Sequence, residues 1–317
     1  MLTDFQTQFA PVASTLEGAT ARGVLWQAAP DRFVLDVPDV ARYLVSDGAV
    51  ITIDRAPDVR DEEVTRFLRM TPLAALFFQR GSLAFHAAAA SPLPPQQGQT
   101  SVDGEGKAGA ILIAGDSGVG KSTLLAALLK RGWRMLADDL AVVEVDAGGQ
   151  LVVLPAFPEI VLWPDAVEKL GLSAATAAGA PGFAQGSPSA GPARPLTRYD
   201  FSDPPGRSIM TSQLAPTPQP LRAIYWLSVH SKGEIEMSEL KGAERFRALG
   251  TLTYNSHIAD ALLDRAAYLR LASAIAQAIP LYRLRRPRGQ WSATELADKI
   301  VMASETLRFG QRDKSSP

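Results

Sequence analysis

The chain of 317 residues contains no cysteine. This absence excludes disulfide frameworks, thiolate metal sites and cysteine nucleophiles, and it fits a protein of the cytoplasm. Charge of one sign is also missing, because 32 basic side chains face 33 acidic ones. The sequence therefore offers no basic surface for nucleic acid and no polybasic membrane anchor.

Long apolar runs are absent as well. No uninterrupted apolar stretch is long enough to span a bilayer. Residues 1–10 contain Asp4 and no positive charge ahead of an apolar core, so we expect no signal peptide. We therefore expect a cytoplasmic protein, with a sizeable core, that binds neither membrane nor nucleic acid.

One motif dominates what is present. Residues 115–122 fit Gly-x-x-x-x-Gly-Lys-[Ser/Thr], the phosphate-binding loop of nucleoside triphosphate enzymes. The apolar residues 110–114 before it predict a buried strand, and residues 121–131 after it predict a helix. Backbone N–H groups of such a loop surround phosphate oxygens. The predicted nucleotide-binding residues are Gly115, Asp116, Ser117, Gly118, Val119, Gly120, Lys121, Ser122 and Thr123.

Two adjacent carboxylates follow the next predicted strand, residues 134–137. A carboxylate at a strand end beside a phosphate loop is where magnesium is held. Because successive strand residues point to opposite faces, Asp138 and Asp139 should have different roles unless the chain bends between them. One would face the metal, and the other would accept a proton from an attacking hydroxyl, which is typical of a kinase. A polar turn that caps the strand is the structural alternative.

Residues 1–82 predict a small N-terminal α/β unit. Alternating strands occupy residues 32–37, 42–45 and 50–53, with a turn at Asp47-Gly48, and a helical pattern over residues 61–80 is interrupted at Thr71-Pro72. We expect the nucleotide-binding catalytic domain at residues 83–310 and a frayed tail at 311–317.

Within that second domain the patterns predict further elements. Residues 172–195 are almost entirely Ala, Gly, Ser and Pro, so we expect a mobile loop there. Residues 221–229 predict a strong strand that pairs with residues 234–240. Other strands are predicted at residues 83–90, 140–145, 151–155 and 281–284, and helices at 165–170, 243–249, 257–278 and 292–307.

The phosphate loop, Arg131-Gly132 and Ala137-Asp138-Asp139 together resemble the catalytic domain of HPr serine kinase/phosphorylase. A wider similarity to short HPr-kinase-like proteins, some of which phosphorylate a serine at the C-terminus of lasso-peptide precursors, covers residues 42–45, 47–48, 79–81, 157–163 and 279–284. The resemblance implies an α/β fold with the P-loop core of mixed sheet and helices that the family shares with phosphoenolpyruvate carboxykinase. A small N-terminal α/β unit and C-terminal helices would flank this core.

The resemblance also implies roles for individual residues. Lys121 and Ser122 would bind ATP phosphates and magnesium, Asp138 would take the proton of an acceptor serine, and Asp139 would face the metal. His86, in a segment that resembles the family's Met-His-Gly, would position the aspartates, although a packed histidine on a buried strand fits equally well. Glu159 would supply a further metal-side carboxylate, or else a charge at a strand edge. One of Arg194, Arg198 and Arg207 would contact the transferred phosphoryl group, and surface solvation is the alternative role for each of them.

The resemblance therefore predicts an ATP- and Mg²⁺-dependent serine kinase that acts on a peptide or small protein and assembles as a homo-oligomer. Trp133 stands where the bacterial kinases usually carry histidine, and their Gly-rich signature loop is missing. These departures weigh against phosphorylase activity and against HPr itself as the acceptor. Two alternatives remain, a small-metabolite kinase of the shikimate-kinase type and a nucleotide-sensing module without catalysis.

Overall fold

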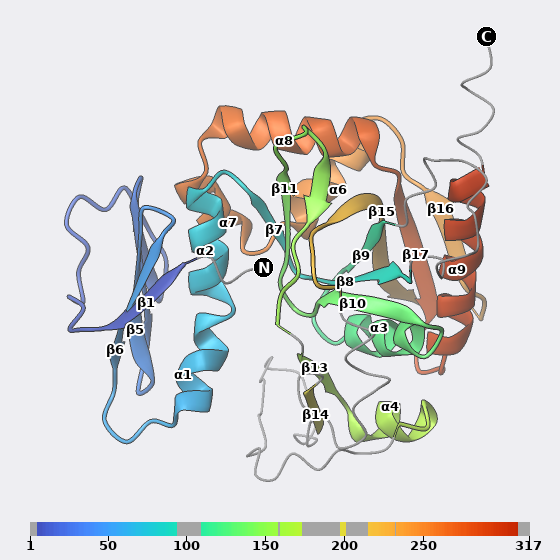
Figure 1. Ribbon diagram of the computed structural model, residues 1–317, viewed down its shortest axis with the longest axis horizontal. Helices are drawn as coiled ribbons and strands as arrows, with labels where there is room; N and C mark the ends of the chain where they lie inside the picture. The colour runs from blue at the N-terminus through green and yellow to red at the C-terminus, as the bar shows by residue number, and fades with distance from the viewer. Residues whose placement is uncertain are drawn as a thin grey trace.

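We analysed a computed structural model, which describes residues 5–93, 109–157, 159–172, 197–200, 215–231 and 233–309. The fold is mixed α/β, with a six-stranded N-terminal sheet and a larger sheet of nine strands. In Figure 1 the two sheets lie on opposite sides of helix α2 (Thr71–Gln79). In the part of the chain that is described, every helix is too short or too polar to cross a membrane.

The N-terminal sheet has the order β1-β6-β5-β4-β3-β2. The predicted strands β4, β5 and β6 are present, and the turn between β5 and β6 places Asp47 and Gly48 at φ values of 55° and 61°. Aspartate and glycine are among the residues that tolerate this left-handed region. The strands span Gln6–Phe9 (β1), Ala21–Arg22 (β2), Trp26–Ala29 (β3), Arg32–Val37 (β4), Ala41–Ser46 (β5) and Val50–Arg55 (β6).

The predicted helical segment after this sheet forms two helices, α1 (Asp61–Leu68) and α2 (Thr71–Gln79). The break confirms the interruption expected at Thr71-Pro72, because proline is tolerated in the first turn of a helix and not in its interior. Helix α2 is almost entirely buried, and it contacts both β5 of the first sheet and β7 of the second. It therefore joins the two sheets through one continuous core.

The larger sheet has the order β10-β8-β9-β15-β12-β11-β7, with β17 also paired to β15 and β16 to β17. Its strands are β7 (Leu83–Phe85), β8 (Ala87–Pro92), β9 (Ala110–Ala114), β10 (Trp133–Ala137), β11 (Ala141–Val145), β12 (Leu151–Val153), β15 (Gln219–His230), β16 (Glu236–Glu239) and β17 (Leu281–Pro287). A separate two-stranded sheet joins β13 (Glu159–Leu162) to β14 (Thr197–Asp200).

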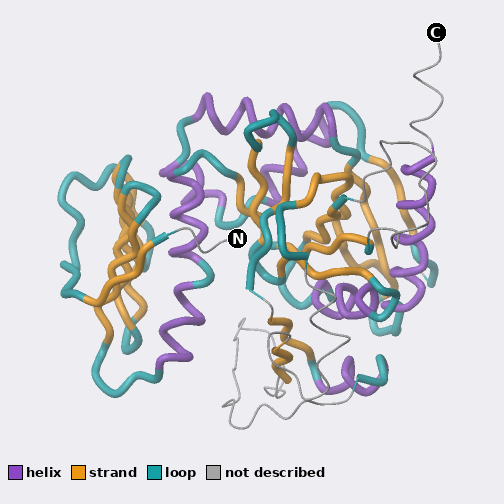
Figure 2. The backbone as a smooth tube through the Cα atoms, viewed as in Figure 1, coloured by secondary structure: helices purple, strands orange, loops and turns teal. Residues whose placement is uncertain are grey.

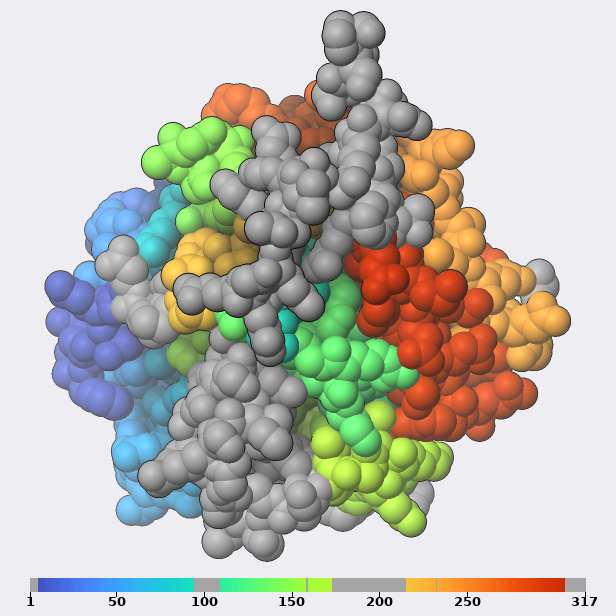
Figure 3. All heavy atoms as spheres, turned by 45° about the vertical axis from the view of Figure 1, so that its right-hand side comes forward, coloured from blue at the N-terminus to red at the C-terminus, as the bar shows by residue number. Residues whose placement is uncertain are grey.

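Both faces of the central strands are buried, which explains why their sequences are apolar throughout rather than alternating. On β9, Leu112 packs into the core shared with α2, whereas Ile111 and Ile113 pack into a second core with α3 and α9. Figure 2 shows helices on both sides of this sheet, and Figure 3 shows α3 and α9 side by side. The remaining helices are α3 (Lys121–Leu129), α4 (Pro164–Lys169), α6 (Ala243–Leu252), α7 (Ser256–Leu262), α8 (Arg265–Ala278) and α9 (Ala293–Phe309).

Three predictions about individual elements were wrong. Residues 83–90 form two strands, because the chain breaks at His86, and β7 then pairs with β11 while β8 pairs with β9. Strand β16 pairs with β17 and not with β15. The helix predicted over residues 257–278 is interrupted at Leu263, and Asp264 caps the new helix by accepting from the N–H of Ala267.

Two further predictions fall mainly or wholly outside the described residues. These are the mobile loop at residues 172–195 and the frayed tail at 311–317. The division into domains at residues 82 and 83 stays a prediction.

Candidate functional site

Strand order and direction bring three segments to one edge of the large sheet. Strand β8 runs antiparallel to β9, and β10 runs antiparallel to β8, so β9 and β10 run in the same direction. Their carboxyl ends therefore lie at the same edge as the amino end of β8. The phosphate loop follows β9, the two aspartates follow β10, and His86 precedes β8. The topology thus gathers the residues that the sequence singled out.

The phosphate loop needs its glycines. Gly115, Gly118 and Gly120 have φ values of 150°, 76° and 106°, a region that other residues rarely adopt. Asp116, Ser117 and Gly118 are exposed at the surface of the loop, while Val119 is buried and anchors it. Gly120 precedes α3, whose first turn contains Lys121, Ser122 and the half-buried Thr123. The strand, loop and helix predicted for this motif are all present.

Lys121 is the most unusual charge in the loop, because it is only 5% exposed. Its Nζ donates to the carbonyl oxygens of Gly115 and Asp116, at 2.9 and 3.0 Å. Burial lowers the pKa of Lys121, and the nearby charges of Asp139, Asp138 and Asp116 oppose that change. The ammonium group is therefore held inside the loop, close to both members of the aspartate pair.

The aspartate pair contacts the loop directly. The Ser122 hydroxyl donates to Asp138 Oδ1 at 3.0 Å. The chain bends after Asp138, because Asp139 has a φ of 68° and the N–H of Leu140 donates back to the Asp138 carbonyl at 2.9 Å. Burial, and then the charge of Asp139, raise the pKa of Asp138 well above its usual value, against the influence of Ser122 and Lys121. Asp138 is thus the carboxylate that touches the predicted metal-binding hydroxyl.

His86 occupies the break between β7 and β8 and is half-buried. Burial lowers its pKa, the charge of Lys121 lowers it further, and Asp139 and Asp116 act in the opposite direction. The strand order places His86 at the same sheet edge as the loop and the aspartate pair, where the charges of Lys121 and Asp139 act on its imidazole.

Tyr254 is a residue of this site that the sequence did not reveal. Its ring meets His86 edge-on, with centroids 6.2 Å apart, and its hydroxyl lies 3.0 Å from Thr71 Oγ1 at the start of α2. Burial raises the pKa of Tyr254, and the charge of Asp139 adds to this effect. The backbone N–H of Tyr254 donates to the Ala84 carbonyl at 2.8 Å. No motif contains Tyr254, so only long-range contacts identify it.

The structure places Glu159 in an ion pair with Arg69, 2.7 Å from its Nη1. The guanidinium of Arg69 also lies over the ring of Phe157, 4.2 Å from its centroid. Among the described residues, no three acidic or histidine side chains form a group that could hold a metal ion. Oxygen ligands for magnesium at this edge would therefore come from Ser122 and the aspartate pair, and Glu159 as a ligand stays a prediction.

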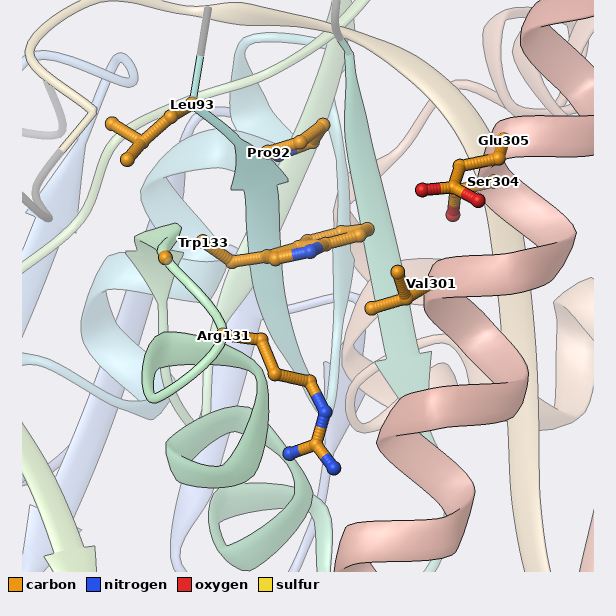
Figure 4. Close-up of a pocket in the computed structure, with 8 residues that line it drawn as sticks. Pro92, Leu93, Arg131, Trp133, Val301, Ser304 and Glu305 are labelled. Carbon is orange, nitrogen blue, oxygen red and sulfur yellow. The ribbon is translucent and has the colours of Figure 1, made fainter.

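A cavity of about 280 Å³ lies elsewhere, beyond the C-terminal end of α3. Figure 4 shows Trp133 and Arg131 facing Val301 of α9 across it. The lining residues are Pro92, Leu93, Arg131, Gly132, Trp133, Val301, Ser304 and Glu305. None of them belongs to the predicted site, since Lys121 and Ser122 lie at the opposite end of α3.

No protein-family model and no curated protein sequence matches this chain. Among solved structures it is similar to the HPr(Ser) kinase/phosphatase from Coxiella burnetii, at 11% sequence identity and a TM-score of 0.31. The similarity covers 74% of this chain and 99% of the other. A similarity this low supports no assignment of function, so the function is inferred from the residues of the site.

Proposed function

We propose that the protein is an ATP- and Mg²⁺-dependent kinase that transfers the γ-phosphoryl group to a serine hydroxyl of a peptide or small protein. The observation that carries this proposal is the hydrogen bond between Ser122 and Asp138, at 3.0 Å. It joins the phosphate loop to a carboxylate pair in one site, and such a pair can serve both magnesium and the proton of an attacking hydroxyl.

The residues fit magnesium and a nucleotide. The available ligands are hydroxyl and carboxylate oxygens, which Mg²⁺ prefers. Gly118 has no atom within 4 Å of the position of an added Cβ, so this part of the loop is open for phosphate oxygens. When bound, magnesium would neutralise phosphate charge. Ser122 and Asp139 would hold it, and Glu159 would join them only by leaving its pair with Arg69.

The chain's own residues then supply position and proton transfer. Lys121 would exchange its loop carbonyls for β- and γ-phosphate oxygens. As the serine oxygen bonds to the γ-phosphorus and the bond to the β-phosphate oxygen breaks, Asp138 would accept the serine proton. His86 would hold the pair in place.

The nature of the acceptor rests on the sequence resemblance. The short HPr-kinase-like proteins that modify lasso-peptide precursors suggest a serine near the C-terminus of a peptide, and HPr-like proteins are the other class. The protein would act as a homo-oligomer by the same resemblance. A peptide or small-protein acceptor is therefore part of the proposal.

Intact-mass spectrometry tests the proposal. Serine-ending precursor peptides and purified HPr would be incubated with Mg-ATP and wild type, Lys121→Ala, Asp138→Asn or Asp139→Asn. We expect a gain of one phosphate with wild type and none with Lys121→Ala. Asp138→Asn should reduce transfer about 10²–10⁴-fold while ATP binding persists.

The other outcomes are equally informative. Transfer at the wild-type rate by Asp138→Asn, with ATP binding intact, would show that Asp138 is not the base. ATP binding without modification of any acceptor would contradict the serine kinase. Transfer to a metabolite pool would then identify a metabolite kinase, and absence of all transfer and hydrolysis would identify a nucleotide sensor.

A further inference from the structure

The end of β17 carries a run of guanidinium groups beside the phosphate loop. Arg283, Arg285 and Arg286 lie on this strand, and Arg288 follows it. Two of these groups have acidic partners, since Arg283 pairs with Glu244 at 3.0 Å and Arg285 with Glu236 at 3.6 Å.

Arg286 lies on the opposite face of the strand. Because side chains alternate along a strand, Arg286 shares its face with Leu284 and Tyr282, which pack into the core that contains α3. The register explains its position. Ala114, the last residue of β9, is level with Trp226 and hence with Arg283, so Arg286 lies three residues beyond the end of β9. This is the level at which the chain of β9 turns into the phosphate loop.

The contacts of Arg286 are with the loop and not with an acid. Its Nε donates to the carbonyl oxygen of Val119 at 2.8 Å, and Nη1 donates to that of Pro287 at 3.3 Å. Nε and Nη2 lie 3.7 and 3.8 Å from the position of an added Cβ on Gly120. Among the residues that the structure describes, no carboxylate pairs with Arg286 and Nη2 has no hydrogen-bond partner.

Such a cation is electrostatically unfavourable without an anion. Arg286 is half-buried, and both burial and the charge of Arg288 lower its pKa. A partly desolvated charge beside a like charge is stabilised when an anion binds between or beside them. The nearest surface built to receive an anion is the phosphate loop that Arg286 already touches.

We infer that Arg286 contacts the polyphosphate of the nucleotide held by the loop. This inference rests on the proposed function only in that a nucleoside triphosphate binds there. Arginine presents several N–H donors in a planar arrangement that matches phosphate oxygens, and Nη2 is the donor left over after the loop contact. The loop would thus hold phosphate between Lys121 on one side and Arg286 on the other.

The test measures binding rather than catalysis. Isothermal titration of the full chain with Mg-ATP and with magnesium tripolyphosphate would compare wild type, Arg286→Ala and Arg286→Lys. Arg285→Ala is the matched control, because it removes a neighbouring guanidinium whose partner is Glu236. We expect Arg286→Ala to weaken both ligands by about tenfold or more, Arg286→Lys to weaken them less, and Arg285→Ala to leave both unchanged.

Several results would overturn the inference. Wild-type affinity of Arg286→Ala for both ligands would do so, and so would a loss for ATP without a loss for tripolyphosphate, which would assign Arg286 to the nucleoside. If Arg286→Ala also lowers the melting temperature of the ligand-free protein, the ionic-strength dependence of binding distinguishes a direct phosphate contact from a structural role of Arg286. A flatter dependence in the variant supports a direct phosphate contact, and an unchanged one reduces Arg286 to a support for Val119.

The result is separable from the test of the kinase. If wild type binds both ligands but modifies no acceptor, the proposed kinase fails while the Arg286 comparison remains valid. If wild type binds neither ligand, both proposals fail.

Discussion

Two glycines of the phosphate loop allow a matched test of how the loop is built. Gly115 and Gly118 both have positive φ values, at 150° and 76°. An added Cβ on Gly115 would overlap the carbonyl oxygen of Leu227, well inside the 3.0 Å that real Cβ contacts respect, whereas one on Gly118 would meet nothing within 4 Å. The substitutions Gly115→Ala and Gly118→Ala both place a side chain at a positive φ, and only Gly115→Ala adds a collision with Leu227.

The magnitudes follow from the packing. A left-handed alanine costs about 1 kcal/mol, which is the expected loss for Gly118→Ala. For Gly115→Ala, an ordinary contact of 3.4 Å would require Leu227 and the loop to separate by about 1 Å. Leu227 is 1% exposed on β15 and cannot move outward, so the added strain brings the total loss to about 3–5 kcal/mol.

Urea unfolding of the two variants and wild type, followed by tryptophan fluorescence, measures both losses as changes in the free energy of unfolding. We expect Gly115→Ala to be less stable than Gly118→Ala by at least about 2 kcal/mol, with unchanged m-values. Equal losses, or a larger loss for Gly118→Ala, would refute the close approach of the loop to β15.

Three further predictions concern the aspartates and their neighbours. Tyr254→Phe should lower kcat by up to about tenfold and leave ATP affinity unchanged. Thr71→Val should have the same effect, and the double variant should lose no more, because both substitutions remove the same hydrogen bond. Steady-state kinetics and ATP titrations of the three variants measure these effects. Because the folded state raises the pKa of Asp138, its ionised form destabilises the ligand-free fold at neutral pH, so Asp138→Asn should be more stable than wild type at pH 7. This advantage should disappear as pH falls toward the ordinary pKa of aspartate, as urea unfolding across that range would show. Chelation with EDTA should abolish phosphoryl transfer, and added Mg²⁺ should restore it; transfer that persists in EDTA would contradict the assignment of oxygen ligands to magnesium.

Local patterns predicted the parts of the site that are continuous in sequence. The strand before Gly115, the loop and the helix from Lys121 all follow from spacing over about twenty residues, and Asp138 follows one helix later. The break between α1 and α2 was equally visible, because Pro72 marks it.

Elements without such a local signal were misjudged. Residues 83–90 are apolar except for His86, so nothing in their pattern shows that the chain leaves one strand partner and joins another at that histidine. The short interruption before α8 was missed because Asp264 reads as one more polar position in a helical pattern, although its carboxylate caps a new helix.

The prediction that β16 pairs with β15 was wrong, and the strand that lies beside β15 instead, β17, carries Arg286. Adjacency in the chain suggested that residues 234–240 would return beside β15, yet β17 occupies that position, parallel to β15. A hairpin needs only a tight turn, whereas a parallel neighbour requires the chain to pass through α6, α7 and α8 first, and no local pattern records that crossover. With β17 beside β15, Arg286 extends past the end of β9 and reaches Val119. The sequence candidates for phosphate contact were Arg194, Arg198 and Arg207. The first and last lie outside the described residues, as does the side chain of Arg198, so Arg286 is the arginine whose contact with the loop the structure shows.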